Sequence, residues 1–336
     1  MNVVLSDMES TPLEFMESLK RTTGMKWTAI DWQSNQMRTG KASEARRYLK
    51  YIFKPLSVVF RKDVENIVAW QQFYGISFAF WSRLLQRPKT ARLTVMTFIY
   101  KPKDGWIGNL YKRFIRYAVT SRYIDTIICP SSDECNRYAE TFGVPREKFT
   151  FVPWCIEDHS TQYRRDPSRE TEYILGTGRS NRDWPLLIES VRDTEYRVKI
   201  IDDTFKSAEI PENVQVFNNV GGGHALQYLA NAWAFVIPID TPDVSAGQTV
   251  LLTAWSFGIP VVCTRGKGLS DDYIEDGVDA LLVDKDPVQL RAALDCLRDD
   301  PKLYECLAQN GRKKFEENYT EKALGRNVGQ TFIERE

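Results

Sequence analysis

Short runs of apolar residues recur along the whole chain and alternate with longer amphipathic stretches. Runs rich in β-branched and aromatic side chains predict buried strands, and the stretches between them have the spacing of helices. Six strands are predicted in the first half, at residues 2–6, 27–31, 66–70, 93–98, 126–129 and 149–152. Six more are predicted in the second, at residues 173–175, 198–201, 214–217, 234–237, 261–263 and 280–283. This alternation predicts an α/β fold built on doubly wound parallel sheets.

The pattern is interrupted once, by the polar segment 157–170, which we interpret as a linker. A chain of 336 residues is long enough for two α/β domains, each with its own core. We therefore predict one domain over residues 1–160 and a second over 161–320. Two helices, at about 301–318 and 321–334, are expected to close the chain.

The net charge is zero, but the charges are divided unevenly. Residues 1–150 hold 24 Lys and Arg against 14 Asp and Glu, which leaves 21 against 31 for residues 151–336. The asymmetry predicts that the first domain faces an anionic partner.

Several classes of protein are disfavoured by composition. No segment is long and apolar enough to cross a bilayer, and the start of the chain does not resemble an export signal, so we expect a cytoplasmic protein. The six cysteines lack metal-ligand or disulfide spacing, and we expect no metal site. Only two histidines occur, which argues against hydrolase triads, and no nucleic-acid recognition motif is present.

The segment 240–264 carries the strongest chemical signal. It is predicted to form a loop, the start of a helix, a Gly-Ile-Pro turn and a buried strand. Small side chains and free N–H groups where the helix begins suit a phosphate, and Ser245 and Thr249 are candidate helix caps. A second signal follows the strand at 173–175, where Arg179 and Arg182, in a turn that contains Gly178, place guanidinium groups at the carboxyl end of a strand.

These segments resemble the donor site of retaining family 4 glycosyltransferases. Residues 251–264, LLTAWSFGIPVVCT, are similar to that family's helix and strand, and Gly178-Arg179 matches the start of its diphosphate-binding turn. Arg182 stands where the family has Lys, and residues 214–220 resemble its base-recognition strand and loop, with Asn219. The resemblance covers about residues 149–330. It implies the GT-B fold, with two Rossmann-like domains facing a cleft and a C-terminal helix, 321–336, that packs back on the N-terminal domain.

The resemblance also implies roles for individual residues. Arg179 and Arg182 would stabilise the leaving diphosphate. The donor would be bound by Gly178, Asn219, Ser245, Ala246, Gly247, Gln248, Thr249 and Thr253. Two family glutamates are replaced here by Ser245 and Thr253, so the donor's ribose and sugar must be held differently. No metal or cofactor is implied beyond a UDP- or GDP-sugar donor.

The acceptor is expected on the first domain, with Asp7 and Tyr100 on its side of the site. Two basic, aromatic-rich stretches, 46–61 and 105–123, are candidates for contact with an anionic membrane. Pro55 would kink or split the first. The membrane-facing candidates are Arg46, Arg47, Lys50, Lys54, Lys112, Arg113 and Arg116. Ordinary helices packing on a sheet are the alternative explanation.

The sequence thus predicts a metal-independent glycosyltransferase that moves a sugar, with retention, from a nucleotide-diphosphate sugar to the hydroxyl of a glycan or lipid-linked acceptor. It would be cytoplasmic and peripheral on the inner face of the cell membrane. Two alternatives stay open: a non-catalytic nucleotide-sugar or partner-binding module, and a nucleotide-sugar epimerase or hydrolase on the same fold.

Overall fold

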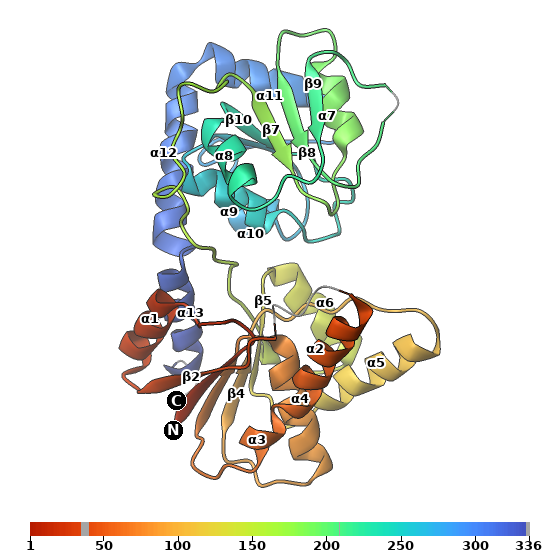
Figure 1. Cartoon of the computed structure of the whole chain (residues 1–336), viewed down its shortest axis with the longest axis vertical. Coiled ribbons are helices and arrows are strands. Elements are labelled where there is room, and N and C mark those ends of the chain that lie inside the picture. Colours follow the sequence, from red (N-terminus) through yellow and green to blue (C-terminus); the bar gives the residue numbers. More distant parts are fainter. Residues whose placement is uncertain (35–39, 208, 334–336) are drawn as a thin grey trace. The chain divides into compact units, whose positions relative to one another are not determined.

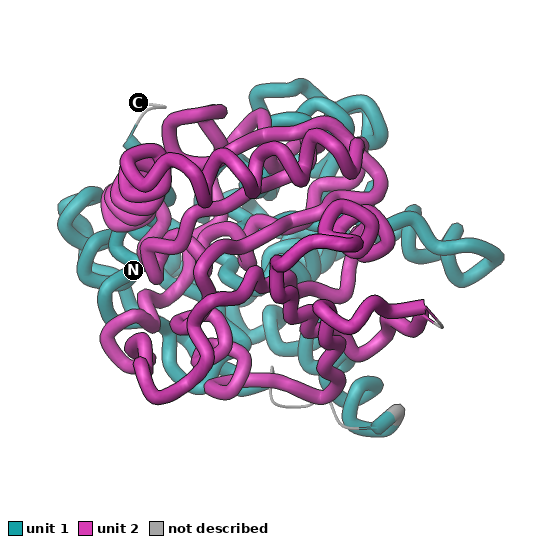
Figure 2. Tube along the Cα trace, turned by 90° about the horizontal axis from the view of Figure 1, so that it is seen from above, with its two compact units in different colours: residues 1–152, 321–336 teal, residues 153–320 magenta. Residues whose placement is uncertain are grey.

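The computed structural model describes residues 1–34, 40–207 and 209–333. The chain forms two compact units, shown in two colours in Figure 2. Unit 1 comprises residues 1–152 and 321–336, and unit 2 comprises residues 153–320. The assignment of donor and acceptor to particular domains stays a prediction.

Unit 1 is built on a parallel six-stranded sheet of order β2-β1-β3-β4-β5-β6 (Figure 1). The strands are β1 (Asn2–Ser6), β2 (Trp27–Asp31), β3 (Asn66–Ala69), β4 (Arg92–Val95), β5 (Thr126–Cys129) and β6 (Phe149–Phe151). Val3 and Leu5 point into the core on one face, whereas Val4 points into the core on the other. This alternation follows from the two-residue period of a strand, and it explains why β1 reads as a continuous apolar run.

Helices cover both faces of this sheet. One face carries α2 (Lys41–Phe53), α3 (Leu56–Val59), α4 (Gln72–Leu84), α5 (Gly105–Val119) and α6 (Ser132–Phe142), with a short 3-10 turn at Arg146–Lys148. The other carries α1 (Leu13–Thr23) and α13 (Glu321–Ile333). Of the two outcomes expected at Pro55, a kink or a split, the structure shows the split, because Pro55 begins α3 after α2 has ended.

The last helix belongs to unit 1 although the helix before it belongs to unit 2. α13 packs directly on α1, and Gly325 makes the close approach that allows it: a Cβ there would lie 2.4 Å from the carbonyl oxygen of Phe15. Arg92 donates to the carbonyls of Thr331 at 2.6 Å and Phe332 at 2.7 Å, which satisfies acceptors at the helix end.

Unit 2 is built on a second parallel six-stranded sheet, of order β12-β11-β10-β7-β8-β9. Its strands are β7 (Ile174–Thr177), β8 (Val198–Ile201), β9 (Val214–Phe217), β10 (Ala234–Ile237), β11 (Val261–Thr264) and β12 (Leu281–Val283). The order reverses direction at β7 and β10. In open α/β sheets such a switch point, at the carboxyl ends of the strands, is where ligands bind.

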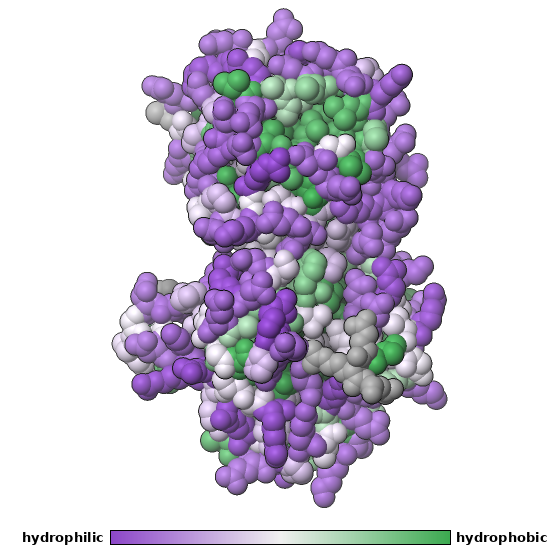
Figure 3. All heavy atoms as spheres, turned by 180° about the vertical axis from the view of Figure 1, so that it is seen from behind, coloured by the Kyte–Doolittle hydropathy of each residue, from purple (hydrophilic) through white to green (hydrophobic). Residues whose placement is uncertain are grey.

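The helices of unit 2 are α7 (Trp184–Val191), α8 (Gly223–Asn231), α9 (Gln248–Ser256), α10 (Ser270–Tyr273), α11 (Pro287–Asp299) and α12 (Pro301–Asn318). α7, α11 and α12 share one core with the sheet, and α9 packs on β10 and β11. The surface of unit 2, the upper part of Figure 3, is hydrophilic around its rim and has a group of hydrophobic residues within that rim in this view. The predicted α/β architecture with two doubly wound sheets is confirmed.

Candidate functional site

The turn after β7 is shaped by one arginine. Arg182 donates to the carbonyl oxygens of Thr177 at 3.2 Å, Ser180 at 2.8 Å and Asn181 at 3.2 Å. Burial lowers the pKa of its guanidinium. Gly178, at φ +127°, makes room for it, because a Cβ there would lie 2.8 Å from Nη2 of Arg182. Arg182 is therefore inside the turn, holding its shape, with Nη2 beside the Gly178 backbone.

Arg179 lies on the outside of the same turn, and 70% of its side chain is exposed. It forms an ion pair with Asp203, whose other oxygen accepts the backbone N–H of Asn219 at 2.6 Å. These residues follow β7, β8 and β9, which are neighbours in the sheet. The structure thus brings Arg179 and Asn219 together through Asp203, a residue that sequence reasoning missed. The acidic pair directly after the predicted strand 198–201 was the available signal.

The turn after β7 is also joined to the loop after β10. Asn181 donates from its side-chain amide to the carbonyl of Thr241 at 2.9 Å and accepts the backbone N–H of Thr241 at 2.8 Å. Lys285, just beyond β12, bridges Asp183 at 2.8 Å and Asp240 at 2.7 Å. These polar links hold the loop 240–247 at the carboxyl edge of the sheet, next to the arginine turn.

The start of α9 differs from the prediction in one respect. Gly247 occupies the N-cap position, and α9 has no side-chain cap, so the expectation that Ser245 or Thr249 caps this helix was wrong. The Ser245 hydroxyl instead accepts from the Gln248 amide at 2.5 Å, and Gln248 also donates to the carbonyl of Gly268 at 3.0 Å. Among the residues that the structure describes, no side-chain cap bonds to the first N–H groups of α9, and these groups carry the positive end of the helix dipole.

Gly247 is required by both conformation and space. Its φ is +104°, and a Cβ would lie 2.8 Å from Cδ2 of Leu269. Thr253 points its hydroxyl along the helix and donates to the carbonyl of Thr249 at 2.6 Å. Ser245, Ala246, Gly247, Gln248 and Thr253 are half-buried, while Thr249 and Asn219 are exposed. The predicted donor residues in the loops and at the start of α9 thus lie at the carboxyl edge of the unit 2 sheet, whereas Thr253 lies further along α9.

In unit 1, Asp7 follows β1 and only 5% of it is exposed. Its carboxylate accepts from the Tyr51 hydroxyl at 3.0 Å and from the Gln71 amide at 3.3 Å. Burial, with the nearby charge of Asp7, raises the pKa of Tyr51 to about 12. Tyr51 therefore remains a protonated donor at neutral pH and orients the Asp7 carboxylate at the carboxyl edge of the sheet.

Tyr100, the other residue expected on the acceptor side, lies in the core of unit 1. Its ring stacks on Tyr111 with centroids 5.7 Å apart, and its backbone N–H donates to the Tyr138 hydroxyl at 3.0 Å. Burial raises its pKa. None of the hydrogen bonds found among the described residues connects Tyr100 with Asp7.

The basic residues predicted to face a membrane lie on α2 (Arg46, Arg47, Lys50) and α5 (Lys112, Arg113, Arg116), with Lys54 just beyond α2. Both helices pack against α4. Lys50 donates to the carbonyl of Trp32 at 3.5 Å, and the Arg47 guanidinium lies over the Tyr48 ring at 5.4 Å. The other five are all exposed.

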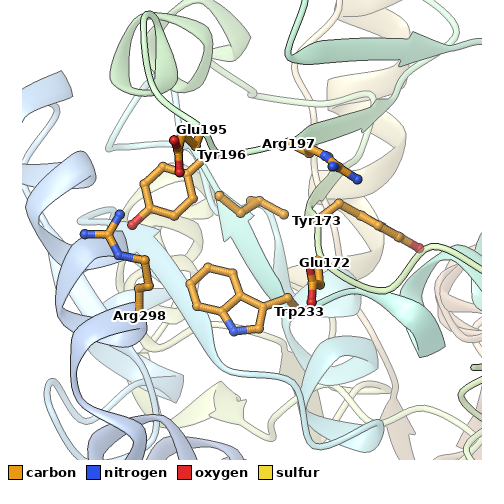
Figure 4. A pocket seen from close by; sticks show the side chains of 8 residues that line it. Glu172, Tyr173, Glu195, Tyr196, Arg197, Trp233 and Arg298 are labelled. Atoms are coloured by element: carbon orange, nitrogen blue, oxygen red, sulfur yellow. The ribbon is translucent and has the colours of Figure 1, made fainter.

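A pocket also opens at the opposite, amino edge of the unit 2 sheet (Figure 4). Tyr196 and Trp233 stack with centroids 6.2 Å apart, and Trp233 stacks on Tyr304 at 5.8 Å. The faces of these rings are used in packing against each other. None of the predicted site residues lines this pocket.

Within the residues that the structure describes, no group of three or more His, Cys, Asp or Glu side chains has the arrangement of a metal site. Over the same residues, none of the helices combines the length and the apolar character needed to span a bilayer.

The chain is similar to known glycosyltransferases in sequence and in fold. Residues 179–300 match the family model described as glycosyl transferases group 1. Structures that cover 98% or more of both chains include Anabaena HepE in complex with UDP (TM-score 0.67, 14% identity) and a glycosyltransferase from Rickettsia africae (0.66, 9%). The lipopolysaccharide glycosyltransferase WaaG is similar too (0.57, 14%), over 98% of this chain and 99% of that chain. The fold is GT-B.

One curated relative is 34% identical over 99 residues: the lipopolysaccharide core biosynthesis glycosyltransferase LpsD of Rhizobium meliloti (strain 1021). The aligned stretch spans 28% of this chain and 29% of the relative. The matched family segment begins at Arg179 and contains Arg182 and the whole loop that leads into α9. The residues matched by the family model therefore include most of the polar residues described at the carboxyl edge of the unit 2 sheet.

Proposed function

We propose that the protein is a glycosyltransferase that uses a nucleoside-diphosphate sugar, with UDP as the preferred nucleotide. The observation that carries this proposal is that Arg179, Arg182 and the uncapped start of α9 lie at one carboxyl edge of the unit 2 sheet, inside the segment matching group 1 glycosyl transferases. The complex of HepE with UDP, on the same fold, supports the choice of nucleotide.

The chemistry needs positive charge where the leaving group develops negative charge. The bond between the sugar C1 and the diphosphate oxygen breaks, and its electron pair leaves with the diphosphate. The acceptor oxygen forms the new bond to C1, and its proton passes to a diphosphate oxygen. Attack on the face that the diphosphate leaves gives retention, and it requires neither a metal nor a strong protein base.

The unit 2 edge offers two kinds of donor for that diphosphate. The first N–H groups of α9 supply fixed dipoles, as helix starts do for phosphates. Arg179, on the outside of its turn, would exchange its ion pair with Asp203 for the diphosphate. Arg182 would act mainly by holding the turn, with Nη2 available beside Gly178. Such preorganised donors stabilise a leaving group because they need not reorient during the reaction.

The acceptor is proposed to bind unit 1, with Asp7 receiving a hydrogen bond from its hydroxyl. Tyr51 and Gln71 fix the carboxylate for this role. We propose a lipid-linked glycan as acceptor, at the inner face of the cell membrane, with α2 and α5 contacting anionic lipid. The excess of basic residues in the first 150 positions and the similarity to lipopolysaccharide glycosyltransferases support this choice.

The test begins with thermal unfolding in the presence of UDP, GDP and ADP. A diphosphate present at about 100 times its dissociation constant adds roughly 2.7 kcal/mol to the free energy of unfolding. We expect UDP to raise the melting temperature of the wild type and of Arg169→Ala, a surface arginine paired with Asp166 outside the site. Arg179→Ala should lose most of that rise. If no diphosphate stabilises the wild type, the proposed donor site is wrong.

Turnover separates a transferase from a binding module. The protein is incubated with radiolabelled UDP-glucose or UDP-galactose and a bacterial lipid extract, and label is counted in the organic phase. A transferase labels lipid, and Arg179→Ala should lower the rate about 10- to 100-fold. If the protein binds UDP but neither transfers nor releases sugar from any UDP-sugar, the result would instead support the binding module. Release of free sugar in the absence of an acceptor would support a hydrolase.

A further inference from the structure

One backbone position at the carboxyl edge of the unit 1 sheet is strained. Thr97, two residues beyond β4, has φ +53°, in the left-handed region. The other non-glycine residues with positive φ in the described part of the chain are Gln, Asn or Asp, so Thr97 alone among them has a branched Cβ. A branched side chain collides with its own backbone in this region, and the conformation persists only where the surrounding structure imposes it.

The backbone on both sides of Thr97 imposes this conformation. The N–H of Met96 donates to the carbonyl of Ala69 at 2.9 Å, which continues the pairing of β4 with β3. The N–H of Phe98 donates instead to the carbonyl of Ile128, in β5, at 2.8 Å. In a regular strand, residues two positions apart donate to the same neighbouring strand. The change of side between 96 and 98 therefore requires an irregular backbone at Thr97.

The loop after Thr97 is fixed by side chains. Gln72, at the start of α4, accepts the backbone N–H of Ile99 at 3.0 Å and donates to the carbonyl oxygen of Ile99 at 3.3 Å. The Phe98 ring is buried in the core, with its centroid 5.2 Å from that of Tyr138. Thr97 is thus held between anchored neighbours, and its side chain projects from a fixed backbone.

The hydroxyl of Thr97 is not used by the fold. The residue is half-buried, and none of the hydrogen bonds formed among the described residues involves that hydroxyl. Glycine would adopt the same φ without strain. A strained residue at a rigid position, whose polar group satisfies nothing within the protein, is a candidate for contact with a ligand.

Thr97 lies level with the carboxylate of Asp7 along the sheet edge. The neighbouring strands β1, β3 and β4 are paired in register at Leu5, Ala69 and Val95. Asp7, Gln71 and Thr97 each lie two residues beyond that row. Because adjacent strands are about 4.8 Å apart, the ends of β1 and β4 are separated by about 10 Å. One sugar unit with a hydrogen bond at each end can bridge such a span.

We infer that Thr97 binds the acceptor, with its hydroxyl hydrogen-bonded to a hydroxyl of the terminal sugar that Asp7 contacts. This role rests on the proposed function, in which the acceptor lies on unit 1 beside Asp7. A threonine hydroxyl both donates and accepts, as a sugar hydroxyl does, so the two groups are complementary without any charge. A site that bonds a substrate hydroxyl in this way discriminates against acceptors that lack it.

The experiment measures transfer of radiolabelled sugar from UDP-glucose or UDP-galactose to increasing amounts of a bacterial lipid extract. Thr97→Val removes the hydroxyl and keeps the branched shape, whereas Thr97→Ser keeps the hydroxyl. We expect Thr97→Val to lower kcat/KM for the extract about five- to tenfold, the effect of one lost hydrogen bond between uncharged groups. Thr97→Ser should stay within about twofold of the wild type. The KM for the UDP-sugar and the stabilisation by UDP should be unchanged in both variants.

Thr97→Gly separates binding from stability. Loss of the strained side chain should raise the melting temperature by about 2 °C, while transfer falls as it does in Thr97→Val. The matched control is Gln86→Gly, because Gln86 has φ +50° and is exposed beyond the end of α4. This control should not lower the melting temperature and should leave transfer unchanged.

Transfer by Thr97→Val at the wild-type rate would overturn the assignment of Thr97. So would a fall in transfer that comes with a lower melting temperature or with loss of stabilisation by UDP, because the role of Thr97 would then be structural. A lower melting temperature in Thr97→Gly would lead to the same conclusion. Failure of the proposed function is distinguishable, since the wild type itself would then label no lipid from either UDP-sugar, and the role of Thr97 would fall with it.

Discussion

At the scale of single residues, Arg179 and Arg182 of the turn after β7 have different surroundings, although the sequence predicted the same role for both. Both were predicted to contact the diphosphate from their position after a strand. Arg182 is committed to three carbonyls of its own turn, whereas Arg179 is exposed and paired with Asp203. Contact of either arginine with a diphosphate stays a prediction. The difference between the two arginines depends on Gly178, which has no side chain and so leaves space for the guanidinium of Arg182 inside the turn.

This division predicts different outcomes for two variants. Arg182→Lys should lower the melting temperature and weaken UDP binding about tenfold, because a point-like ammonium cannot hold three carbonyls in the guanidinium's planar arrangement. Arg179→Lys should weaken UDP binding while leaving the melting temperature of the free protein unchanged. Calorimetric titration with UDP and thermal unfolding of both variants check the prediction. Equal melting temperatures for the two would contradict the structural role of Arg182.

A buried lysine predicts a pH dependence of stability. Burial lowers the pKa of Lys148 from 10.5 to about 8, and its ammonium donates to the carbonyl of Ser121 at 2.7 Å. Between about pH 8 and 10.5 the unfolded chain therefore binds more protons than the folded one, so this group makes stability rise with pH across that window. Lys148→Met should be more stable than the wild type at pH 7, by about 1 kcal/mol once solvent screening is allowed for, with the difference shrinking towards pH 10.

Urea unfolding at pH 7, 8.5 and 10 measures that difference. Lys148→Arg serves as the control, because it stays charged throughout the range and should not regain stability as the pH rises. A constant difference between Lys148→Met and the wild type at all three values would show that Lys148 titrates normally.

At the scale of elements, the apolar pattern predicted all twelve strands with ends mostly within one or two residues of those observed. It succeeded because parallel strands buried on both faces leave continuous apolar runs. Helix starts were harder to predict. The cap of α9 was assigned to Ser245 or Thr249, but neither caps the helix, and the Ser245 hydroxyl bonds to Gln248, which it meets only after the loop has folded. The exposure of Trp106 on α5 could not be predicted either. The amphipathic pattern of α5 is the same whether all of its apolar side chains are buried or some are exposed.

The contact between α9 and α12 yields a stability prediction. Gly311 on α12 lies against Trp255 of α9, and a Cβ there would lie 2.4 Å from Cδ1 of the buried indole. Gly311→Ala should lower the free energy of unfolding by about 1–3 kcal/mol, since the ring has no space to move. Gln309→Ala, at an exposed position of the same helix, should change it by less than about 0.5 kcal/mol. Urea unfolding compares the two, and a neutral Gly311→Ala would contradict this packing.

At the scale of the whole molecule, two units with similar architecture carry different chemistry at their carboxyl edges. Unit 2 gathers cations and helix N–H groups where the sequence indicated a donor, and unit 1 presents the Asp7 carboxylate. The residues proposed to bind the donor could be selected from the sequence because they follow predicted strands in short motifs. The Asp7, Tyr51 and Gln71 network was not, because its members come from three separate elements and meet only in the fold.

Because α13 belongs to unit 1, we expect a substitution in this helix to change the stability of unit 1 without changing that of unit 2. Gly325→Val should disturb the packing of α13 on α1, because even a Cβ would meet the Phe15 carbonyl. Unfolding of unit 1 should then shift to lower temperature, while stabilisation of unit 2 by UDP persists. Scanning calorimetry with and without UDP measures both, and Lys322→Val, at a less buried position of the same helix, is the control. Loss of UDP binding in Gly325→Val would show that donor binding depends on this helix.

We propose above all that a nucleoside diphosphate binds at the carboxyl edge of the unit 2 sheet. A crystal structure of the protein with UDP, grown at a concentration that calorimetry shows to be saturating, tests it most directly. We expect the diphosphate at the first N–H groups of α9, with Arg179 turned from Asp203 onto the diphosphate oxygens. UDP bound in the pocket beside Trp233, or calorimetry that detects no binding of UDP or GDP, would contradict it.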